Sequence, residues 1–336
     1  FEKTPFSFRQ FMDESMKIMG MKAHEKGIEL AYRIAPTIPD RVLGDPVRLR
    51  QVLLNLVDNA IKFTEKGAVT VSAAAQSQTD YEVVLHISVA DTGIGIPEDK
   101  QRSIFGAYTQ GDPSTLRHYG GTGLGLAVSA QLVDLMGGEI KLKSQPSRGS
   151  SFRFTACFMI QQNGEGHKTE IVHPDLVGLN VLVVDDNDSS REIVTEILED
   201  LEIKVVSASG PQEAKEMLST SQAENARFDL ILIDSDMPET DGFSLAKWIV
   251  NQQISDAGII MLLSFPHLKR KAELEVLGID ASIVKPFGAS ELEETILKAL
   301  GIVKPETELS AKAQKKAIRV PSRSLRILVA EDTTFN

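Results

Sequence analysis

The sequence predicts an α/β protein with two domains, followed by the beginning of a third. Its 336 residues suffice for two or three domains, and the shares of hydrophobic (42%) and charged (25%) residues are typical of globular proteins. Two polar, turn-rich stretches, 161–177 and 301–324, are predicted to be linkers. Amphipathic helices and alternating strands precede the first linker, and short apolar strands alternate with helices between the two. We therefore expect domains at 1–160 and 178–300.

The composition argues against several classes of function. A net charge of −11 gives no general affinity for nucleic-acid backbones, so we expect no nucleic-acid partner. The single cysteine, Cys157, lies in the alternating stretch SFRFTACF and is predicted to be a buried strand residue, without a disulfide framework. No apolar stretch approaches the length of a membrane span, and we expect a cytoplasmic chain. Because the chain starts at Phe1 without an initiator methionine, we expect a fragment of a longer protein.

The most informative helix of the first domain is predicted at about 46–63. Its apolar stripe consists of Leu49, Val52, Leu53, Leu56, Val57, Ala60 and Ile61. A narrow polar stripe borders it and consists of Arg48, Gln51, Asn55, Asn59 and Lys62. Asparagine is a poor helix former, and a solvated face would usually carry mixed Glu and Lys. The stripe is therefore predicted to face a binding cleft.

Two further stretches of this domain combine a regular element with glycines. In LHISVADTGIGIP, a predicted strand ends at Asp91 and is followed by glycines. In GGTGLGLAVSAQLVDLMGG, residues 120–138, glycines precede a helix whose core stripe is predicted to be Leu124, Val128, Leu132 and Leu135. Glycines in this place allow backbone amides to approach a phosphate at the helix end, but their spacing fits neither a dinucleotide fingerprint nor a P-loop.

These stretches, together with IFGAYTQ and GSSFRF, stand in the order of the catalytic, ATP-binding domain of sensor histidine kinases, which residues 1–160 resemble. The resemblance implies an α/β sandwich of the GHKL (Bergerat) type that binds ATP and Mg²⁺. It also implies that Asp91 accepts a hydrogen bond from the adenine amine, which an ionised carboxylate can do. It makes Asn59 a magnesium ligand, Asn55 a catalytic neighbour one turn earlier, and Lys62 a phosphate contact.

The same resemblance assigns the glycines to the nucleotide site. It implies ATP contacts at Gly93, Gly95, Gly121, Gly123, Leu124 and Gly125, the last four by amides of a mobile lid and the helix that follows it. The lid motif of the family usually reads Phe-x-Pro-Phe, whereas Phe105-Gly106-Ala107-Tyr108 lacks the proline. We therefore expect looser lid packing, with nucleotide binding retained.

The second domain is predicted to be a doubly wound parallel sheet of five strands, VLVV, KVVSA, LILI, IIML and SIV. The carboxyl ends of these strands carry Asp185 and Asp186, Asp234, Ser264 and Lys285. In an open α/β sheet the ligand site lies beyond those ends. Three carboxylates packed together repel one another unless a cation neutralises them, which predicts bound Mg²⁺.

The stretches DLILIDSDMPETDG and VKPF resemble those of response-regulator receiver domains, which have a flavodoxin-like fold. The resemblance covers 178–300 and implies that Asp234 is the nucleophile that becomes phosphorylated. Asp185, Asp186 and Asp234 would hold the metal, the catalytic Lys285 would pair with the phosphoryl oxygens, and the Ser264 hydroxyl would bond the phosphate. Where the family usually has an aromatic switch residue, this chain has Ser282, so the conformational output is expected to differ or be weak.

The end of the chain repeats the start of the second domain. LRILVAEDTTFN, residues 325–336, has the pattern of LNVLVVDDNDSS at 179–190 and is interpreted as the start of a second receiver. An ATP-binding domain, a receiver and a further receiver stand in the order of a hybrid sensor histidine kinase of a two-component phosphorelay. The resemblance implies a homodimer whose partners are an upstream dimerisation domain with the phosphoacceptor histidine and a further receiver or histidine phosphotransfer protein. The sequence leaves open whether the full-length protein is anchored in the bacterial inner membrane.

Two other functions remain open at this stage. A GHKL-type ATPase clamp would share the ATP fold, but such enzymes carry a glutamate where this chain has Asn55. A nucleotide-binding regulatory phosphoacceptor module without kinase activity is the other alternative. None of the six histidines lies in a His-Glu-x-Arg-type segment; His24 has the glutamate but lacks the basic residue and the proline. We therefore expect that this chain alone cannot autophosphorylate.

Overall fold

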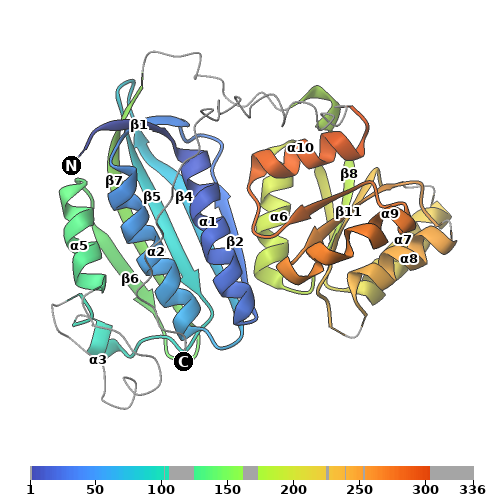
Figure 1. Ribbon diagram of the computed structural model, residues 1–336, viewed down its shortest axis with the longest axis horizontal. Helices are drawn as coiled ribbons and strands as arrows, with labels where there is room; N and C mark the ends of the chain where they lie inside the picture. Colours follow the sequence, from blue (N-terminus) through green and yellow to red (C-terminus); the bar gives the residue numbers. More distant parts are fainter. Residues whose placement is uncertain are drawn as a thin grey trace, which may run out of the picture.

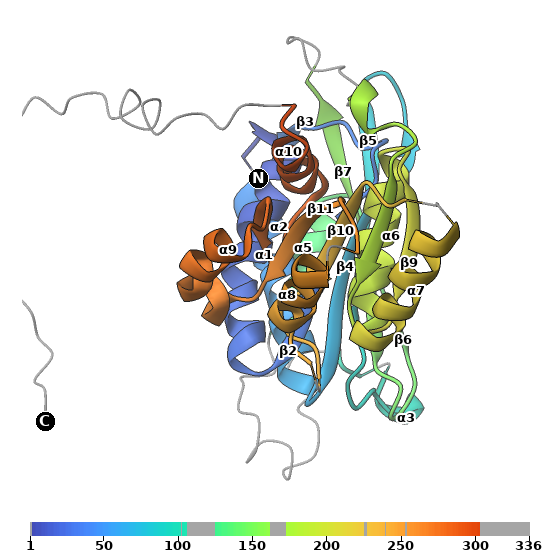
Figure 2. The same ribbon diagram turned by 90° about the vertical axis from the view of Figure 1, so that its right-hand side faces the viewer.

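The structure is a computed structural model that describes residues 2–101, 103–105, 125–161, 173–224, 227–238, 240–252 and 254–302. Two α/β domains lie side by side, each built on its own sheet (Figure 1). Seen after a quarter turn, α1 of the first domain and α10 of the second lie on the same side of the molecule (Figure 2). Among the described residues, no helix is long and apolar enough to cross a membrane. The predicted start of a second receiver and the predicted linker 301–324 lie outside the described residues, apart from the first two positions of that linker.

The first domain is a mixed seven-stranded sheet with helices packed on one face (Figure 1). Its strands are β1 (Thr4–Ser7), β2 (Ile28–Ile34), β3 (Arg41–Gly44), β4 (Gly67–Gln78), β5 (Glu82–Asp91), β6 (Ile140–Ser144) and β7 (Ser150–Ile160). Its helices are α1 (Phe8–Glu25), α2 (Pro46–Phe63), α3 (Glu98–Gln101) and α5 (Gly125–Leu135). The strand order is β1-β3-β7-β5-β4-β2, with β6 paired to β7, so β2 lies at one edge.

Helix α2 forms where the sequence predicts it. Asp45 caps the helix by accepting a hydrogen bond from the amide of Arg48 at 3.1 Å, and Pro46 occupies the first turn, where no amide hydrogen is needed. The buried residues of α2 are the seven that the apolar stripe predicts, which confirms that stripe.

Two packing predictions for this domain are wrong. In α5, Val128 and Leu135 are 36% and 65% exposed, whereas Ala127, Ser129 and Val133 are buried. Both sides of this helix carry apolar residues, and the side with the small residues packs against α2. Cys157 is exposed, because the buried positions of β7 are the alternate ones that include Phe154 and Phe158.

The second domain has a five-stranded parallel sheet, as predicted, in the order β12-β11-β10-β8-β9. Its strands are β8 (Asn180–Val184), β9 (Lys204–Ala208), β10 (Leu230–Asp234), β11 (Gly258–Leu263) and β12 (Ala281–Val284). Its helices are α6 (Asp188–Asp200), α7 (Pro211–Glu224), α8 (Gly242–Gln252), α9 (Lys271–Leu277) and α10 (Ala289–Ala299), besides short 3-10 helices at Pro174–Leu176 and Phe265–Arg270. Helices α6 and α10 pack on one face, and α7, α8 and α9 on the other. The three central strands are buried on both faces and end at one edge, where the predicted acidic residues stand.

Candidate functional site

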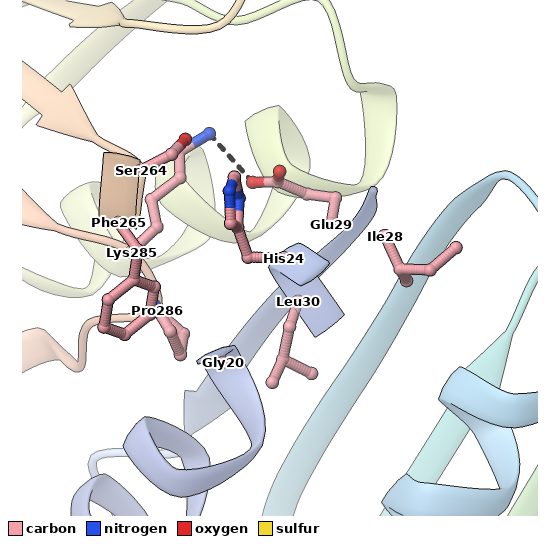
Figure 3. A pocket seen from close by; sticks show the side chains of 9 residues that line it. All are labelled: Gly20, His24, Ile28, Glu29, Leu30, Ser264, Phe265, Lys285 and Pro286. Atoms are coloured by element: carbon pink, nitrogen blue, oxygen red, sulfur yellow. Dashed lines mark hydrogen bonds and ion pairs between the residues drawn. The ribbon is translucent and has the colours of Figure 1, made fainter. Parts of the chain in front are cut away.

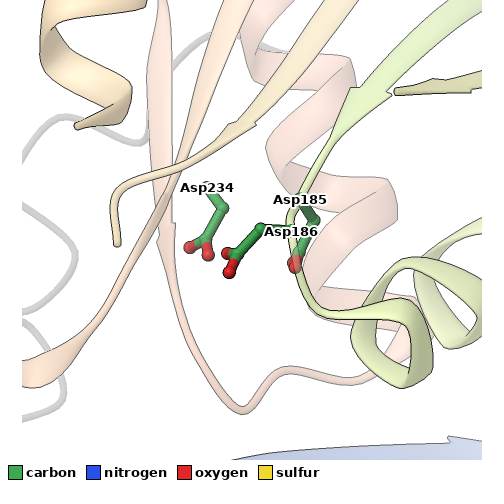
Figure 4. A group of neighbouring side chains, drawn as sticks. All are labelled: Asp185, Asp186 and Asp234. Carbon is green, nitrogen blue, oxygen red and sulfur yellow. The ribbon is translucent and has the colours of Figure 1, made fainter. Parts of the chain in front are cut away.

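An acidic cluster lies beyond the carboxyl ends of β8 and β10 (Figure 4). Asp185 and Asp186 follow β8, Asp234 ends β10, and one carboxylate oxygen of each lies within 4.8 Å of the others. Asp185 and Asp234 are buried, whereas Asp186 is exposed. Asp185 is held in place by the amide of Asn187 and the hydroxyl of Ser190, which donate hydrogen bonds at 2.8 Å to its two oxygens.

Lys285, which follows β12, reaches into this cluster. Its Nζ lies 2.8 Å from Oδ2 of Asp185 and 3.1 Å from Oδ1 of Asp234, and a third carboxylate, that of Glu29 in the first domain, lies 2.8 Å away. Burial lowers the pKa of Lys285, but the three carboxylates outweigh burial and raise that pKa well above its ordinary value. The lysine is therefore a fixed positive charge at the centre of the cluster.

The single charge of Lys285 does not balance the three carboxylates of the acidic cluster. Burial raises the pKa of Asp234, although the ammonium of Lys285 opposes this, and burial together with the charge of Asp185 raises the pKa of Asp186. The Oδ1 atom of Asp234 is buried, and its partner is the ammonium of Lys285 in an ion pair of 3.1 Å. Carboxylate oxygens grouped in this way fit a hard divalent cation such as Mg²⁺.

Ser264 and Ser282 are placed by two neighbouring strands of the second domain, β11 and β12. Ser264 follows β11, is buried, and its amide donates a hydrogen bond to Oγ of Ser235 at 3.2 Å. Ser264 also lines a pocket that Lys285 and Glu29 share (Figure 3). Ser282 lies in β12 and is half-buried. Ser264 and Lys285 therefore line one pocket, and the ammonium of Lys285 connects this pocket to Asp234.

In the first domain, the polar stripe of α2 meets the start of α5. Nδ2 of Asn55 donates a hydrogen bond to Oγ of Ser129 at 2.9 Å, and a Cβ added at Gly125 would lie only 2.4 Å from Oδ1 of Asn55. Asn59 is half-buried one turn further along α2, and Lys62 follows with its Nζ 5.2 Å from the ring centre of Phe63. The sequence analysis missed Ser129, although a serine within an apolar helix was a signal for it.

Asp91 stands at the end of β5 with the glycine loop wrapped around it. Its Oδ1 accepts hydrogen bonds from the amides of Gly93 at 2.9 Å and Ser150 at 3.2 Å. Burial raises the pKa of Asp91, and these two hydrogen bonds lower it in part. A Cβ at Gly93 would lie 2.3 Å from the carbonyl oxygen of Phe63, so this glycine allows the loop to touch the end of α2.

The remaining predicted nucleotide residues are placed only in part. Gly95 has a φ of +68°, and a Cβ there would lie 2.0 Å from the carbonyl oxygen of Gln145. Phe105 makes an edge contact with Phe152, with ring centres 6.3 Å apart. Gly121, Gly123, Leu124 and Tyr108 lie outside the described residues.

One charged residue at the acidic cluster was missed by the sequence analysis. Glu29 lies on β2, where buried and half-buried residues alternate so that Glu29 and Arg33 share the face turned away from the core of the first domain. Such an alternation is visible in the sequence IELAYRI, but an isolated glutamate on it is ordinarily solvated. Its partner lies 256 residues further along the chain.

Each of the two domains matches a known protein family. Residues 44–160 match the family described as histidine kinase-, DNA gyrase B-, and HSP90-like ATPase. Residues 181–297 match the response regulator receiver domain. The acidic cluster therefore belongs to a receiver domain, and the asparagine helix to an ATPase domain of this family.

The curated relatives of this chain are longer proteins. The signal transduction histidine-protein kinase BarA of Escherichia coli (strain K12) is 33% identical over 87% of this chain, and the chain covers 31% of that protein. The sensor protein GacS of Pseudomonas syringae pv. syringae is 37% identical over 61% of this chain, which covers 22% of GacS. The chain thus spans less than a third of the length of these curated relatives.

A solved structure also resembles most of the chain. The crystal structure of full-length ShkA in complex with AMPPNP has a TM-score of 0.69 and 27% identity, and the match covers 91% of this chain and 58% of that one. The likeness extends over more than one domain, because neither family match alone covers as much of the chain.

Proposed function

From the premise that this chain belongs to the hybrid sensor histidine kinases, we propose that it binds ATP in its first domain and accepts a phosphoryl group on Asp234 of its receiver. The observation that carries the proposal is the meeting of Asp234, Asp185 and Lys285 at the end of the parallel sheet, in a chain that also has an ATPase domain of the histidine-kinase type. Three buried or half-buried charges of this kind serve stability poorly, because desolvating them is costly.

In the first domain, the proposed nucleotide site lies between α2, the end of β5 and the start of α5. The ionised carboxylate of Asp91 would accept a hydrogen bond from the adenine amine. Asn59 would hold Mg²⁺ through its amide oxygen, with Asn55 beside it, and Lys62 would meet the phosphates. Gly93 and Gly95 would shape the loop, and the amides of Gly121, Gly123, Leu124 and Gly125 would bind phosphate oxygens. The AMPPNP complex of ShkA supports a nucleotide of the ATP class.

The proposed reaction has two transfers. The γ-phosphoryl group of ATP passes to a histidine nitrogen of the dimerisation domain, and ADP leaves with the electrons of the broken phosphorus–oxygen bond. A carboxylate oxygen of Asp234 then attacks the phosphorus, and the phosphorus–nitrogen bond breaks with its electron pair returning to the imidazole. Lys285 would pair with the phosphoryl oxygens and Ser264 would donate a hydrogen bond to one of them.

Asp185, Asp186 and Asp234 would hold the Mg²⁺ of the receiver. When bound, the cation would neutralise the negative charge that gathers between the carboxylate and the phosphoryl oxygens. The grouping of the three carboxylates supports this assignment, because they lie within 4.8 Å of one another and the single charge of Lys285 does not balance them.

The further partners follow from the same family. The full-length protein would be a homodimer in the cytoplasm, where ATP is available, and Asp234 would pass its phosphoryl group to a histidine phosphotransfer protein or exchange it with a further receiver. The departure at Ser282 suggests that the output of the receiver differs from that of relatives with an aromatic residue there.

The test is phosphate transfer in the presence of a separately supplied dimerisation domain. With labelled ATP and Mg²⁺, the histidine of that domain should gain acid-labile phosphate first, and Asp234 should then gain alkali-labile phosphate. Asp234→Asn should abolish only the second signal, whereas the matched control Asp236→Asn, two residues further, should retain both. Nucleotide binding without phosphohistidine would favour a regulatory module, and release of inorganic phosphate without either signal would favour an ATPase clamp.

A further inference from the structure

The first domain presents a charged strand face to the receiver. Strand β2 lies at the edge of its sheet, and its outward residues include Glu29 and Arg33. Helix α6 of the receiver packs against β2 and β4, so this edge is covered by the neighbouring domain (Figure 1). Both residues form ion pairs across the interface, and the two charges of β2 are opposite in sign.

Glu29 reaches the lysine at the acidic cluster of the receiver. Its Oε1 accepts a hydrogen bond from Nζ of Lys285 at 2.8 Å, the contact drawn as a dashed line in Figure 3. The same nitrogen contacts Asp185 and Asp234, so the three hydrogens of the ammonium already face three carboxylates. The side chain of Glu29 is 24% exposed, and it lines a pocket together with Ser264 and Lys285.

The contact is part of a fitted interface rather than an isolated surface pair. Arg33 forms a forked ion pair with Asp200 on α6, with nitrogen–oxygen distances of 2.7 and 3.0 Å. Close approach is made possible by Gly20 on α1, where an added Cβ would lie 2.4 Å from Cδ of Pro286, the residue after the lysine. Gly288 of the receiver likewise allows close contact with the first domain, because a Cβ there would lie 2.7 Å from the hydroxyl of Tyr32.

A phosphoryl group and the Glu29 carboxylate would compete for the same partner. Phosphorylation adds about two negative charges and three acceptor oxygens, which Lys285 is placed to receive. The Glu29 carboxylate would then lie close to the doubly charged phosphoryl group. Like charges about 4 Å apart repel each other by several kcal/mol even in a partly screened site. The docked arrangement therefore suits the unphosphorylated receiver.

We propose that Glu29 occupies the place of a phosphoryl oxygen at Lys285, so that docking of the ATP-binding domain and phosphorylation of Asp234 exclude one another. The inference rests on the proposed function of Asp234 as the acceptor. Docking hinders phosphorylation because Glu29 occupies Lys285, and since the two equilibria are linked, phosphorylation in turn weakens the docking of β2 and α1. The exposed surfaces of β2 and α1 lie before residue 44, where the match to the ATPase family begins, whereas that of β4 lies within the match.

Phosphorylation by labelled acetyl phosphate with Mg²⁺ tests whether docking hinders phosphorylation of Asp234. An oxygen of Asp234 forms a bond to phosphorus while acetate leaves with the electrons of the broken bond, so neither ATP nor a dimerisation domain is needed. Glu29→Gln should label Asp234 about fivefold faster or more, the lower end of usual coupling between sites. Gly20→Ala, which retains Glu29 and favours the helix but clashes with Pro286, should accelerate labelling likewise. The control Glu25→Gln removes an exposed carboxylate of the same domain and should label at the wild-type rate.

Small-angle scattering of the full chain tests whether phosphorylation releases the ATP-binding domain from the receiver. Mg²⁺ with beryllium fluoride, a phosphoryl mimic, should increase the radius of gyration of the wild type, and Glu29→Gln and Gly20→Ala should be expanded without it. If Asp234 labels in the wild type and in Glu29→Gln at equal rates, and the mimic changes no dimension, the inference is wrong while the acceptor assignment stands. If Asp234 labels in neither protein, both are wrong, because the uncovered pocket should accept phosphate.

Discussion

Replacement of Lys285 by methionine should strongly destabilise the receiver domain. The substitution keeps the length of the side chain but removes the ammonium that contacts Asp185, Asp234 and Glu29. Glu29 can escape into water when the domains separate, whereas Asp185 and Asp234 are built into the sheet ends and remain buried. The variant therefore leaves two buried carboxylates without a positive partner.

The distances set the size of the effect. At 2.8 Å and an effective dielectric constant of about 20, one ion pair amounts to about 6 kcal/mol before desolvation. Desolvation of the lysine offsets much of this, and removal of one partner from a buried pair typically costs about 3–5 kcal/mol. At about 1.5 kcal/mol per molar urea for a domain of this size, the unfolding midpoint should fall by about 2–3 M. Mg²⁺ should recover part of the loss, because a cation bound by the same carboxylates replaces the missing charge.

Trp248 makes the measurement specific. It is the only tryptophan of the chain and lies on α8 of the receiver, so its fluorescence in urea reports the unfolding of this domain rather than of the first. Lys204→Met, which removes an exposed lysine from the same domain, should change stability by less than about 0.5 kcal/mol. An equal midpoint for Lys285→Met and Lys204→Met in the absence of Mg²⁺ would refute the argument that this lysine compensates buried charge.

Three other outcomes are expected. Burial raises the pKa of Asp91 above its ordinary value of 3.8, and adenine recognition needs the ionised carboxylate. The affinity for ATP should therefore be highest at neutral pH and should begin to fall on acidification before pH 3.8 is reached. Titration calorimetry that shows a constant affinity down to about pH 4 would contradict this. The isolated chain with labelled ATP and Mg²⁺ should gain no acid-labile, alkali-stable phosphate, because none of its six histidines stands in a phosphoacceptor motif; gel analysis at both pH extremes decides it. Arg33→Asp and Asp200→Arg should each expand the chain in scattering and together restore its dimensions, with a coupling of about 1–2 kcal/mol; equal expansion of the double variant would show that this pair does not hold the domains.

The parts of the fold that the sequence predicts are those where one local signal dominates. Helix α2 carries a cap, a proline in its first turn and a single apolar stripe, so its bounds and buried face could be predicted. Helix α5 has Val128 and Leu135 on one side and Ala127 and Val133 on the other, so periodicity alone could not choose the buried face. Packing of α5 against α2 determines which face is buried, because small residues allow the two helices to approach closely.

The candidate sites divide in the same way. Asp185, Asp234 and Lys285 could be predicted to meet, because residues at the carboxyl ends of parallel strands share one edge of a sheet. The hydrogen bond between Asn55 and Ser129 could not, because it depends on how two helices cross. The roles of these residues in binding and transfer remain predictions.

Glu29 shows why a regulatory contact is harder to predict from sequence than an active site. Charged residues on an edge strand are common for another reason, since they hinder pairing with strands of other molecules, and the alternation of β2 therefore has a sufficient local explanation. What distinguishes Glu29 is the identity of its partner, a lysine that already serves two aspartates within a different domain. A charge that the strand edge needs in any case becomes an interdomain contact here, because the receiver places the fixed cation of Lys285 opposite it. The same reasoning limits the contact, since a carboxylate that competes with a phosphoryl group can hold the domains together only as long as Lys285 has no stronger partner.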